Sequence, residues 1–223
     1  MMAEALAAED LARRLRAGDA ALFPTDTLPA LSATPAAAGD LWRLKRRPAD
    51  KPLILMAADL EQLLAFLSAD WPSDAPLAWL DQARLCWPGP VTLVLPIRGR
   101  CTDALHPGGA SLGLRIPACP MARELLRLSG PLATTSANRS GEAAARQASE
   151  AAAIFPEVPL LAPLPWPSGS GEASTVLAWV GGLGSAEAPA WTVLRAGPMD
   201  SAAESPAQGK GSIRALDATG RER

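Results

Sequence analysis

Apolar and polar positions repeat with helical or strand periods along most of the chain. Residues 4–17 carry Leu6, Leu11 and Leu15 on one stripe, with charged side chains opposite, which predicts an amphipathic helix. Asp59 has the residue type of a helix N-cap before an apolar repeat. The patterns predict further helices at about 37–45, 59–67, 76–85, 120–128 and 147–154, and strands at 20–23, 53–56, 91–96, 112–116, 132–134, 174–180 and 191–195.

The order of these elements predicts the fold class and the domain organisation. Helices separate some of the strands, but several strands follow one another directly. This favours an α/β domain with a mixed sheet over a fully parallel one. The apolar period stops near Gly197. We therefore expect one domain over residues 1–197 and a disordered tail over 198–223.

Composition narrows the class of protein further. The chain has 223 residues, of which 48% are hydrophobic, so it is long enough to bury a core. No apolar run approaches the roughly 20 residues that span a bilayer, and the N-terminus lacks the pattern of a signal peptide. We expect a soluble, cytoplasmic protein that does not bind a membrane.

The inventory of reactive residues excludes several chemistries. With a single histidine, His106, the chain cannot form a multi-histidine metal site, and a Ser-His-Asp triad would have to use that residue. The three cysteines lack C-x-x-C spacing and are expected to be reduced thiols. Neither G-x-G-x-x-G nor a Walker A sequence is present. The net charge of −2 means that nucleic-acid binding would need a local basic patch.

Three polar segments end or interrupt predicted strands, where α/β proteins place their sites: 25–27, 45–51 and 134–141. Singly, each fits a turn, a solvated face or a loop that satisfies its own backbone. Together, their cations suit a triphosphate, and their hydroxyl and amide groups suit a ribose or a small amino acid. Arg115 adds a planar fork for a carboxylate or phosphate. Because no nucleophile is paired with a base, we expect charge stabilisation and orientation rather than a covalent enzyme intermediate.

Seven motifs in order carry a family resemblance. They are 23–27 (FPTDT), 45–53 (KRRPADKPL), 87–92 (WPGPVT), 113–117 (GLRIP), 135–141 (TSANRSG), 174–176 (STV) and 194–197 (LRAG). Over roughly residues 5–197 this series resembles the YrdC family, the threonylcarbamoyl-AMP synthases. The resemblance implies a twisted, mixed or mostly parallel sheet with flanking helices and a basic concave face.

The resemblance also implies a reaction and its partners. L-threonine, bicarbonate and ATP give threonylcarbamoyl-adenylate and pyrophosphate, a nucleotidyl transfer in which Mg²⁺ is expected to accompany ATP. The adenylate serves the threonylcarbamoyladenosine modification of tRNA, so tRNA is an expected partner, either directly or through downstream transfer enzymes.

Site residues carry over position by position. Lys45 and Arg47 match the K-x-R pair and are expected to stabilise phosphate charge, although no residue is assigned as a certain catalytic group. No metal ligand is implied. The residues expected to bind ATP are Lys45, Arg47, Lys51, Ser111, Ser136, Asn138 and Arg195, with Ser136 and Asn138 matching the S-x-N signature. The residues expected to bind threonine are Thr27, Arg115 (through the carboxylate), Thr134 and Ser174.

One segment departs from the family pattern. After Thr27 the family usually continues with an aromatic residue and a glycine pair, whereas this chain reads Leu28-Pro29-Ala30-Leu31-Ser32. Proline fixes φ, and the loss of glycine removes access to positive φ, so the loop must take another path. This supports one alternative, a YrdC-like protein that binds double-stranded RNA or tRNA and has reduced or lost synthase activity. A carbamoyl-transferring domain like those of hydrogenase-maturation proteins is disfavoured, because the zinc-finger cysteines and acylphosphatase segment of those larger proteins are absent.

Overall fold

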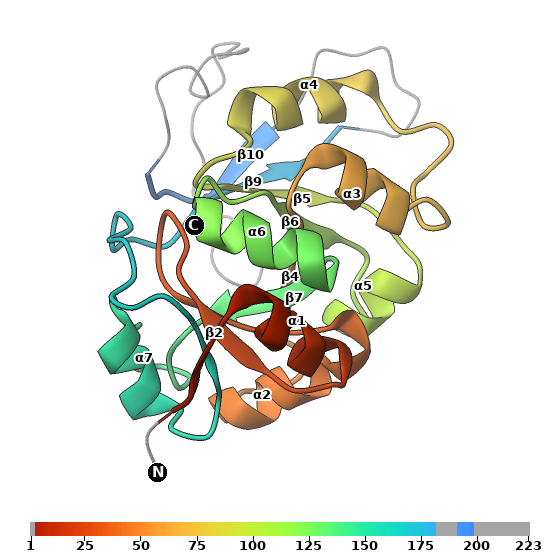
Figure 1. Ribbon diagram of the computed structural model, residues 1–223. Helices are drawn as coiled ribbons and strands as arrows, with labels where there is room; N and C mark the ends of the chain where they lie inside the picture. The colour runs from red at the N-terminus through yellow and green to blue at the C-terminus, as the bar shows by residue number, and fades with distance from the viewer. Residues whose placement is uncertain (1–2, 182–190, 199–223) are drawn as a thin grey trace.

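The computed structural model describes residues 3–181 and 191–198 (Figure 1). Its strands are β1 (Ala5–Leu6), β2 (Ala21–Phe23), β3 (Ala30–Ala33), β4 (Ile54–Met56), β5 (Val91–Leu95), β6 (Leu112–Arg115), β7 (Leu132–Ser136), β8 (Leu160–Leu161), β9 (Thr175–Trp179) and β10 (Trp191–Arg195). Its helices are α1 (Ala8–Arg16), the 3₁₀ turn η1 (Pro35–Ala37), α2 (Gly39–Lys45), α3 (Leu60–Phe66), α4 (Leu77–Cys86), α5 (Arg100–Leu105), α6 (Pro120–Ser129) and α7 (Ala148–Ile154). Apart from Pro198, the predicted tail lies outside the described residues.

The strands of the described residues form one sheet in the order β1-β8-β2-β3-β7-β4-β6-β5-β9-β10. Parallel pairs join β8 to β1 and β2, β4 to β6, and β5 to β9. The remaining neighbours, such as β3 with β7 and β5 with β6, are antiparallel. The mixed α/β sheet predicted from the order of the elements is therefore confirmed.

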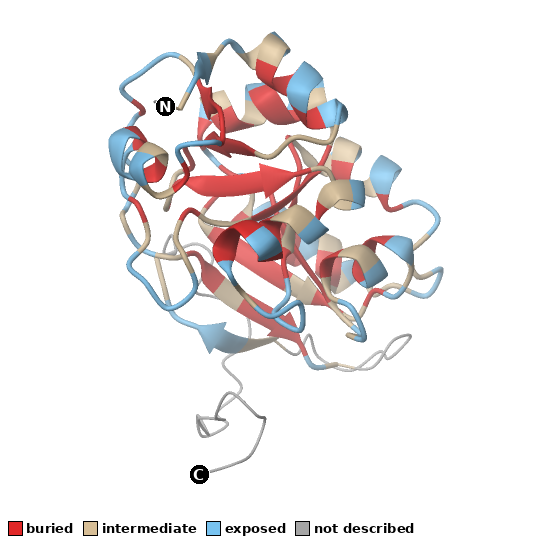
Figure 2. Ribbon diagram, turned by 90° about the horizontal axis from the view of Figure 1, so that it is seen from below, coloured by how far each residue is buried: buried red, intermediate tan, exposed pale blue. Residues whose placement is uncertain are grey.

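Two main apolar clusters hold the sheet and helices together. Because side chains alternate across a strand, Phe23 packs into a cluster with α1 and α6, whereas its neighbour Leu22 packs into the larger cluster. Met56 and Leu55 on β4 divide in the same way. Figure 2 shows the result, with buried strands inside and the exposed parts of the helices outside. No helix of the described ranges is long and apolar enough to cross a membrane.

The N-terminal segment differs from its predicted helix. Ala5–Leu6 form β1, and the helix begins only at Ala8. The cause is tertiary, because Leu160 and Ala162 donate their backbone N–H groups to Glu4 O and Leu6 O at 2.7 Å each. A parallel pairing with β8 thus replaces the first helical turn. By contrast, Asp59 caps α3 as predicted, since its Oδ1 accepts from the N–H of Gln62 at 2.9 Å.

Strand β3 was not predicted, and neither were α5 and β8. Ala30–Ala33 has little strand propensity, but it is buried along its whole length between β2 and β7. In this register Ala30 lies opposite both Phe23 and Ser136. The polar connection 24–29 is therefore placed beside the end of β7, within the polar segment 134–141.

Candidate active site

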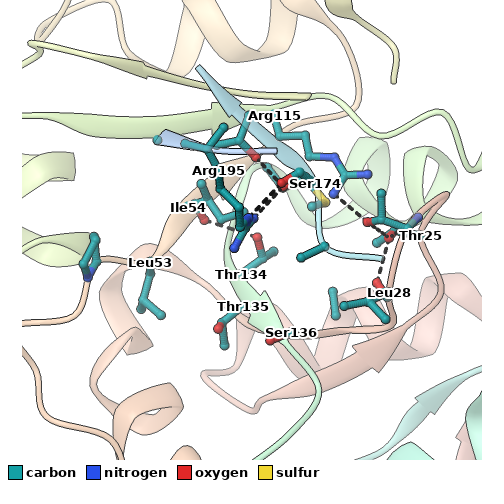
Figure 3. A pocket seen from close by; sticks show the side chains of 18 of the residues that line it. Thr25, Leu28, Leu53, Ile54, Arg115, Thr134, Thr135, Ser136, Ser174 and Arg195 are labelled. Carbon is teal, nitrogen blue, oxygen red and sulfur yellow. Dashed lines mark hydrogen bonds between the residues drawn. The ribbon is translucent and has the colours of Figure 1, made fainter. Parts of the chain in front are cut away.

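A cavity of about 340 Å³ opens on one face of the sheet. On β4, β5 and β6 its floor consists of alternating strand positions, and the residues between them, Leu55, Leu93 and Leu114, are fully buried in the core. On β7 the intervening Thr135 also lines the cavity and is half-buried. The floor residues are Ile54 and Met56 from β4, Thr92 and Val94 from β5, Gly113 and Arg115 from β6, Thr134 and Ser136 from β7, and Val176 from β9. Figure 3 shows Thr25, Leu28 and Arg115 grouped at one end of this cavity.

Gly113 leaves room in the floor. A Cβ at this position would lie 2.6 Å from the Cγ2 methyl of Ile54, which is closer than a side chain tolerates. Gly113 and Ile54 are also directly paired between β6 and β4. The cavity therefore depends on a missing side chain in the middle of two adjacent strands.

The structure brings together eight of the eleven predicted site residues as lining of this cavity. They are Thr27, Arg47, Ser111, Arg115, Thr134, Ser136, Ser174 and Arg195. Lys45, Lys51 and Asn138 are not among the lining residues. Lys51 is exposed, close in sequence to the lining residue Pro52.

Lys45 is buried beneath the turn that follows β7. Its Nζ donates to Ser136 O at 2.7 Å, to Asn138 O at 2.8 Å and to Asn138 Oδ1 at 2.8 Å. These bonds occupy all three ammonium donors. Burial, and secondarily the charge of Arg47, lowers the pKa of Lys45 to about 8. A direct bond from Lys45 to a phosphate would therefore require one of these three bonds to be exchanged.

Three arginines give the cavity its electrostatic character. Arg47, Arg115 and Arg195 line it, and no aspartate or glutamate is among its lining residues. Burial lowers the pKa of Arg47 and of Arg195. The charged form is thus partly desolvated and incompletely compensated, and an anionic ligand would supply the missing counter-charge.

Arg115 is the most enclosed of the three and is only 3% exposed. Its Nη2 forms a salt bridge of 2.9 Å with Asp26, its Nη1 donates to Thr27 Oγ1 at 2.8 Å, and its Nε donates to Gly89 O at 3.1 Å. Burial lowers the pKa of Arg115, an effect that Asp26 opposes. A guanidinium has five N–H donors, so these three bonds leave one N–H on Nη1 and one on Nη2.

Arg195 and Ser174 are bonded to each other across the end of β9 and β10. The Nε of Arg195 donates to Ser174 O at 2.9 Å, and its Nη2 donates to Ser174 Oγ at 3.1 Å. The hydroxyl of Ser174 is also 2.9 Å from that of Thr92. This network fixes one wall of the cavity. The hydrogen bonds of Arg47 are longer, with Nη2 donating to Pro52 O at 3.1 Å and Nη1 to Thr135 Oγ1 at 3.4 Å.

Sequence reasoning did not single out Thr25, Thr92 and His106, which line the cavity. It also did not single out Asp26, which forms the salt bridge with Arg115. The signal for Thr92 was available, because a polar residue alternates with apolar ones in a buried strand. His106 carried no such signal. Its place follows from the loop after α5, where its Nδ1 lies 3.0 Å from Ser111 O. Leu28 and Pro29, from the segment that departs from the family pattern, also line the cavity.

Metal-ligating residues do not gather around this cavity. Among residues 3–181 and 191–198, no three His, Cys, Asp or Glu side chains are grouped so as to hold a metal ion. The cavity instead combines arginine cations with hydroxyl groups. These features define a mixed α/β protein with an arginine-lined pocket on the face of its sheet.

Comparisons with known proteins agree with this class. The family described as "Telomere recombination" (Sua5, YciO, YrdC) matches residues 13–197. The threonylcarbamoyl-AMP synthase of Stutzerimonas stutzeri is 36% identical over 152 residues, which cover 67% of this chain and 80% of that protein. The chain belongs to the Sua5/YciO/YrdC family.

Two solved structures have the same fold. P. abyssi Sua5 in complex with L-threonine has a TM-score of 0.68 and 31% identity, covering 77% of this chain. This chain spans 50% of the length of that Sua5. E. coli YciO also has a TM-score of 0.68, with 22% identity over 86% of this chain and 90% of its own, a likeness of fold alone.

Proposed function

We propose that this protein is a threonylcarbamoyl-AMP synthase, a nucleotidyltransferase that uses L-threonine, bicarbonate and ATP. The observation that carries the proposal is the pocket lined by Arg47, Arg115 and Arg195 without a lining carboxylate, in a chain of this family. The names of its relatives support the same activity. Both carboxylate and triphosphate are anions of the kind that such a pocket favours.

The reaction takes place in two steps that need no covalent enzyme intermediate. The amine nitrogen of threonine forms a bond to the carbon of bicarbonate, and water leaves to give a carbamate. A carbamate oxygen then bonds to the α-phosphorus of ATP as the bond to the β-phosphate oxygen breaks and pyrophosphate leaves. The protein's contribution is to hold three reactants in place and to stabilise the negative charge on phosphorus oxygens.

The lining of the cavity suits the two larger substrates. At one end, Arg115 has two N–H donors left for the threonine carboxylate, with Thr27 beside it. Arg47 and Ser111 offer a cation and a hydroxyl group for ATP, and Ser136, which pairs with Ala30 beside the connection 24–29, offers a second hydroxyl. Arg195 lies near Ser174, on the wall where phosphate charge and amino acid would meet.

We further propose that ATP enters with Mg²⁺ held mainly by its own phosphates and by water, which is the ion's usual manner of binding. We also propose that the adenylate product is used for tRNA modification.

The test is pyrophosphate release from ATP by the purified protein, with threonine or bicarbonate omitted in turn. We expect release only when both are present. ATP binding without turnover on any amino acid would contradict the proposal and favour the RNA-binding alternative.

A further inference from the structure

The hydroxyl of Thr25 has a fixed direction. Its Oγ1 lies 2.7 Å from Leu28 O and 3.1 Å from the backbone nitrogen of Thr27. A carbonyl oxygen only accepts and a backbone N–H only donates, so Thr25 gives its one proton to Leu28 and receives a bond from Thr27. Figure 3 shows Thr25 and Leu28 joined in this way at the Arg115 end of the cavity.

The direction of Thr25 determines that of Thr27. Their hydroxyl oxygens are 3.0 Å apart, and since the proton of Thr25 is already used, Thr27 must donate in this bond. Arg115 Nη1 donates to the same Thr27 oxygen at 2.8 Å. The Thr27 hydroxyl thus has no proton left to give, but it has room to accept one more bond.

The backbone of this turn has little freedom to rearrange. Ser170 and Gly171 donate their N–H groups to Asp26 O at 3.0 Å and Thr27 O at 3.2 Å. A Cβ on Gly169 would lie 2.2 Å from Thr27 O, so the two segments are in direct backbone contact. Thr25 and Thr27 are each only 3% exposed. The polarity of Thr27 is therefore built into the fold before any ligand binds.

We propose that Thr25 is a positioning residue that makes Thr27 an acceptor for the α-amine of the amino-acid substrate. This inference rests on the proposed function. An α-amino acid carries a donor amine next to its carboxylate, and the site offers an acceptor oxygen 2.8 Å from the guanidinium nitrogen that would face that carboxylate. The pairing excludes a ligand that presents only an acceptor at the amine position, because Thr27 could not donate to it.

The test compares Thr25→Val, which keeps the shape and loses the hydroxyl, with Thr25→Ser, which keeps the hydroxyl. Calorimetric titrations measure the affinity of wild type and both variants for ATP, for threonine, and for 3-hydroxybutanoate, which lacks the amine. We expect Thr25→Val to bind threonine about tenfold more weakly, with ATP and 3-hydroxybutanoate unaffected. Thr25→Ser should behave as wild type.

Two results would overturn the inference and leave the proposed function in place. The first is an unchanged affinity of Thr25→Val for threonine. The second is an equal loss of affinity for all three ligands in Thr25→Val, together with impaired binding in Thr25→Ser. The wild-type titration separates the two proposals. If wild type binds ATP but not threonine, the proposed function fails, and the inference fails with it because it names the amino acid as the ligand.

Discussion

Replacing Lys45 by methionine distinguishes two roles for this residue: a direct ligand of phosphate, or a support for the turn beside the site. Methionine keeps a long apolar stem and loses the ammonium group. In the structure Lys45 is 3% exposed, and its ammonium group donates to three oxygens of Ser136 and Asn138. The backbone oxygen of Lys45 also accepts from Ser140 at 2.9 Å, so the same turn is bound at two points.

The expected loss of stability is the difference between two effects. Each bond from a charged donor contributes about 1.5–3 kcal/mol. Against this stands the burial of the ammonium group, because a pKa lowered from 10.5 to about 8 corresponds to a cost of about 3 kcal/mol at neutral pH. Water reaches half-buried Asn138 in the variant and replaces part of what is lost. We expect a net destabilisation of about 2 kcal/mol, or a melting temperature about 4–8 °C lower.

The assay combines thermal unfolding with calorimetric titration of ATP, and Arg47→Met serves as the matched control. Arg47 lines the cavity and its loss should weaken ATP binding with a smaller change in melting temperature. Lys45→Met should lower the melting temperature and weaken ATP binding through displacement of Ser136. A Lys45→Met protein that melts like wild type but no longer binds ATP would refute this reasoning and assign Lys45 directly to phosphate.

Three further predictions follow from the same features. Between about pH 8 and 10.5 the unfolded chain keeps a proton on Lys45 that the folded protein has released. The stability of wild type relative to Lys45→Met should therefore rise with pH across this window, which denaturant unfolding at several pH values measures. A difference in stability that does not change with pH would contradict the lowered pKa of Lys45. Because Pro29 and Ala30 line the cavity where the family usually has an aromatic residue and a glycine, serine should be adenylated at a detectable rate beside threonine, with a discrimination of only about 1–3 kcal/mol. Strict selectivity for threonine would show that the loop compensates. Truncation after Pro198 should leave the melting temperature unchanged, since the sequence beyond it has no apolar period; a fall of several degrees would mean that those residues pack on the domain.

The sequence predicted those elements whose pattern is local. The apolar repeat of 120–128 and the Asp59 cap match α6 and α3, because helix periodicity and caps depend on near neighbours. Strand β3 could not be predicted, because Ala30–Ala33 is a strand only through its pairing with β2 and β7. The same applies to β1, where pairing with β8 outweighs a local helical pattern.

The candidate site shows the same division. Motif order was sufficient to select residues such as Arg115 and Thr134, which line the cavity. It could not reveal that Lys45 points under the turn rather than into the cavity, because that depends on where the oxygens of Ser136 and Asn138 lie in space. Nor could spacing reveal the fixed direction of the Thr25 hydroxyl, which depends on a single carbonyl of the departing loop.

Direct detection of the product is the measurement that tests the central claim most closely. The purified protein is incubated with ATP, Mg²⁺, threonine and ¹³C-labelled bicarbonate, and the mixture is analysed by mass spectrometry. The proposed function predicts a threonylcarbamoyl-adenylate that carries the isotope label, formed together with pyrophosphate and lost when Arg115 is replaced by methionine. Adenylate formation without label, or the absence of any adenylate from a protein that binds both ATP and threonine, would contradict it.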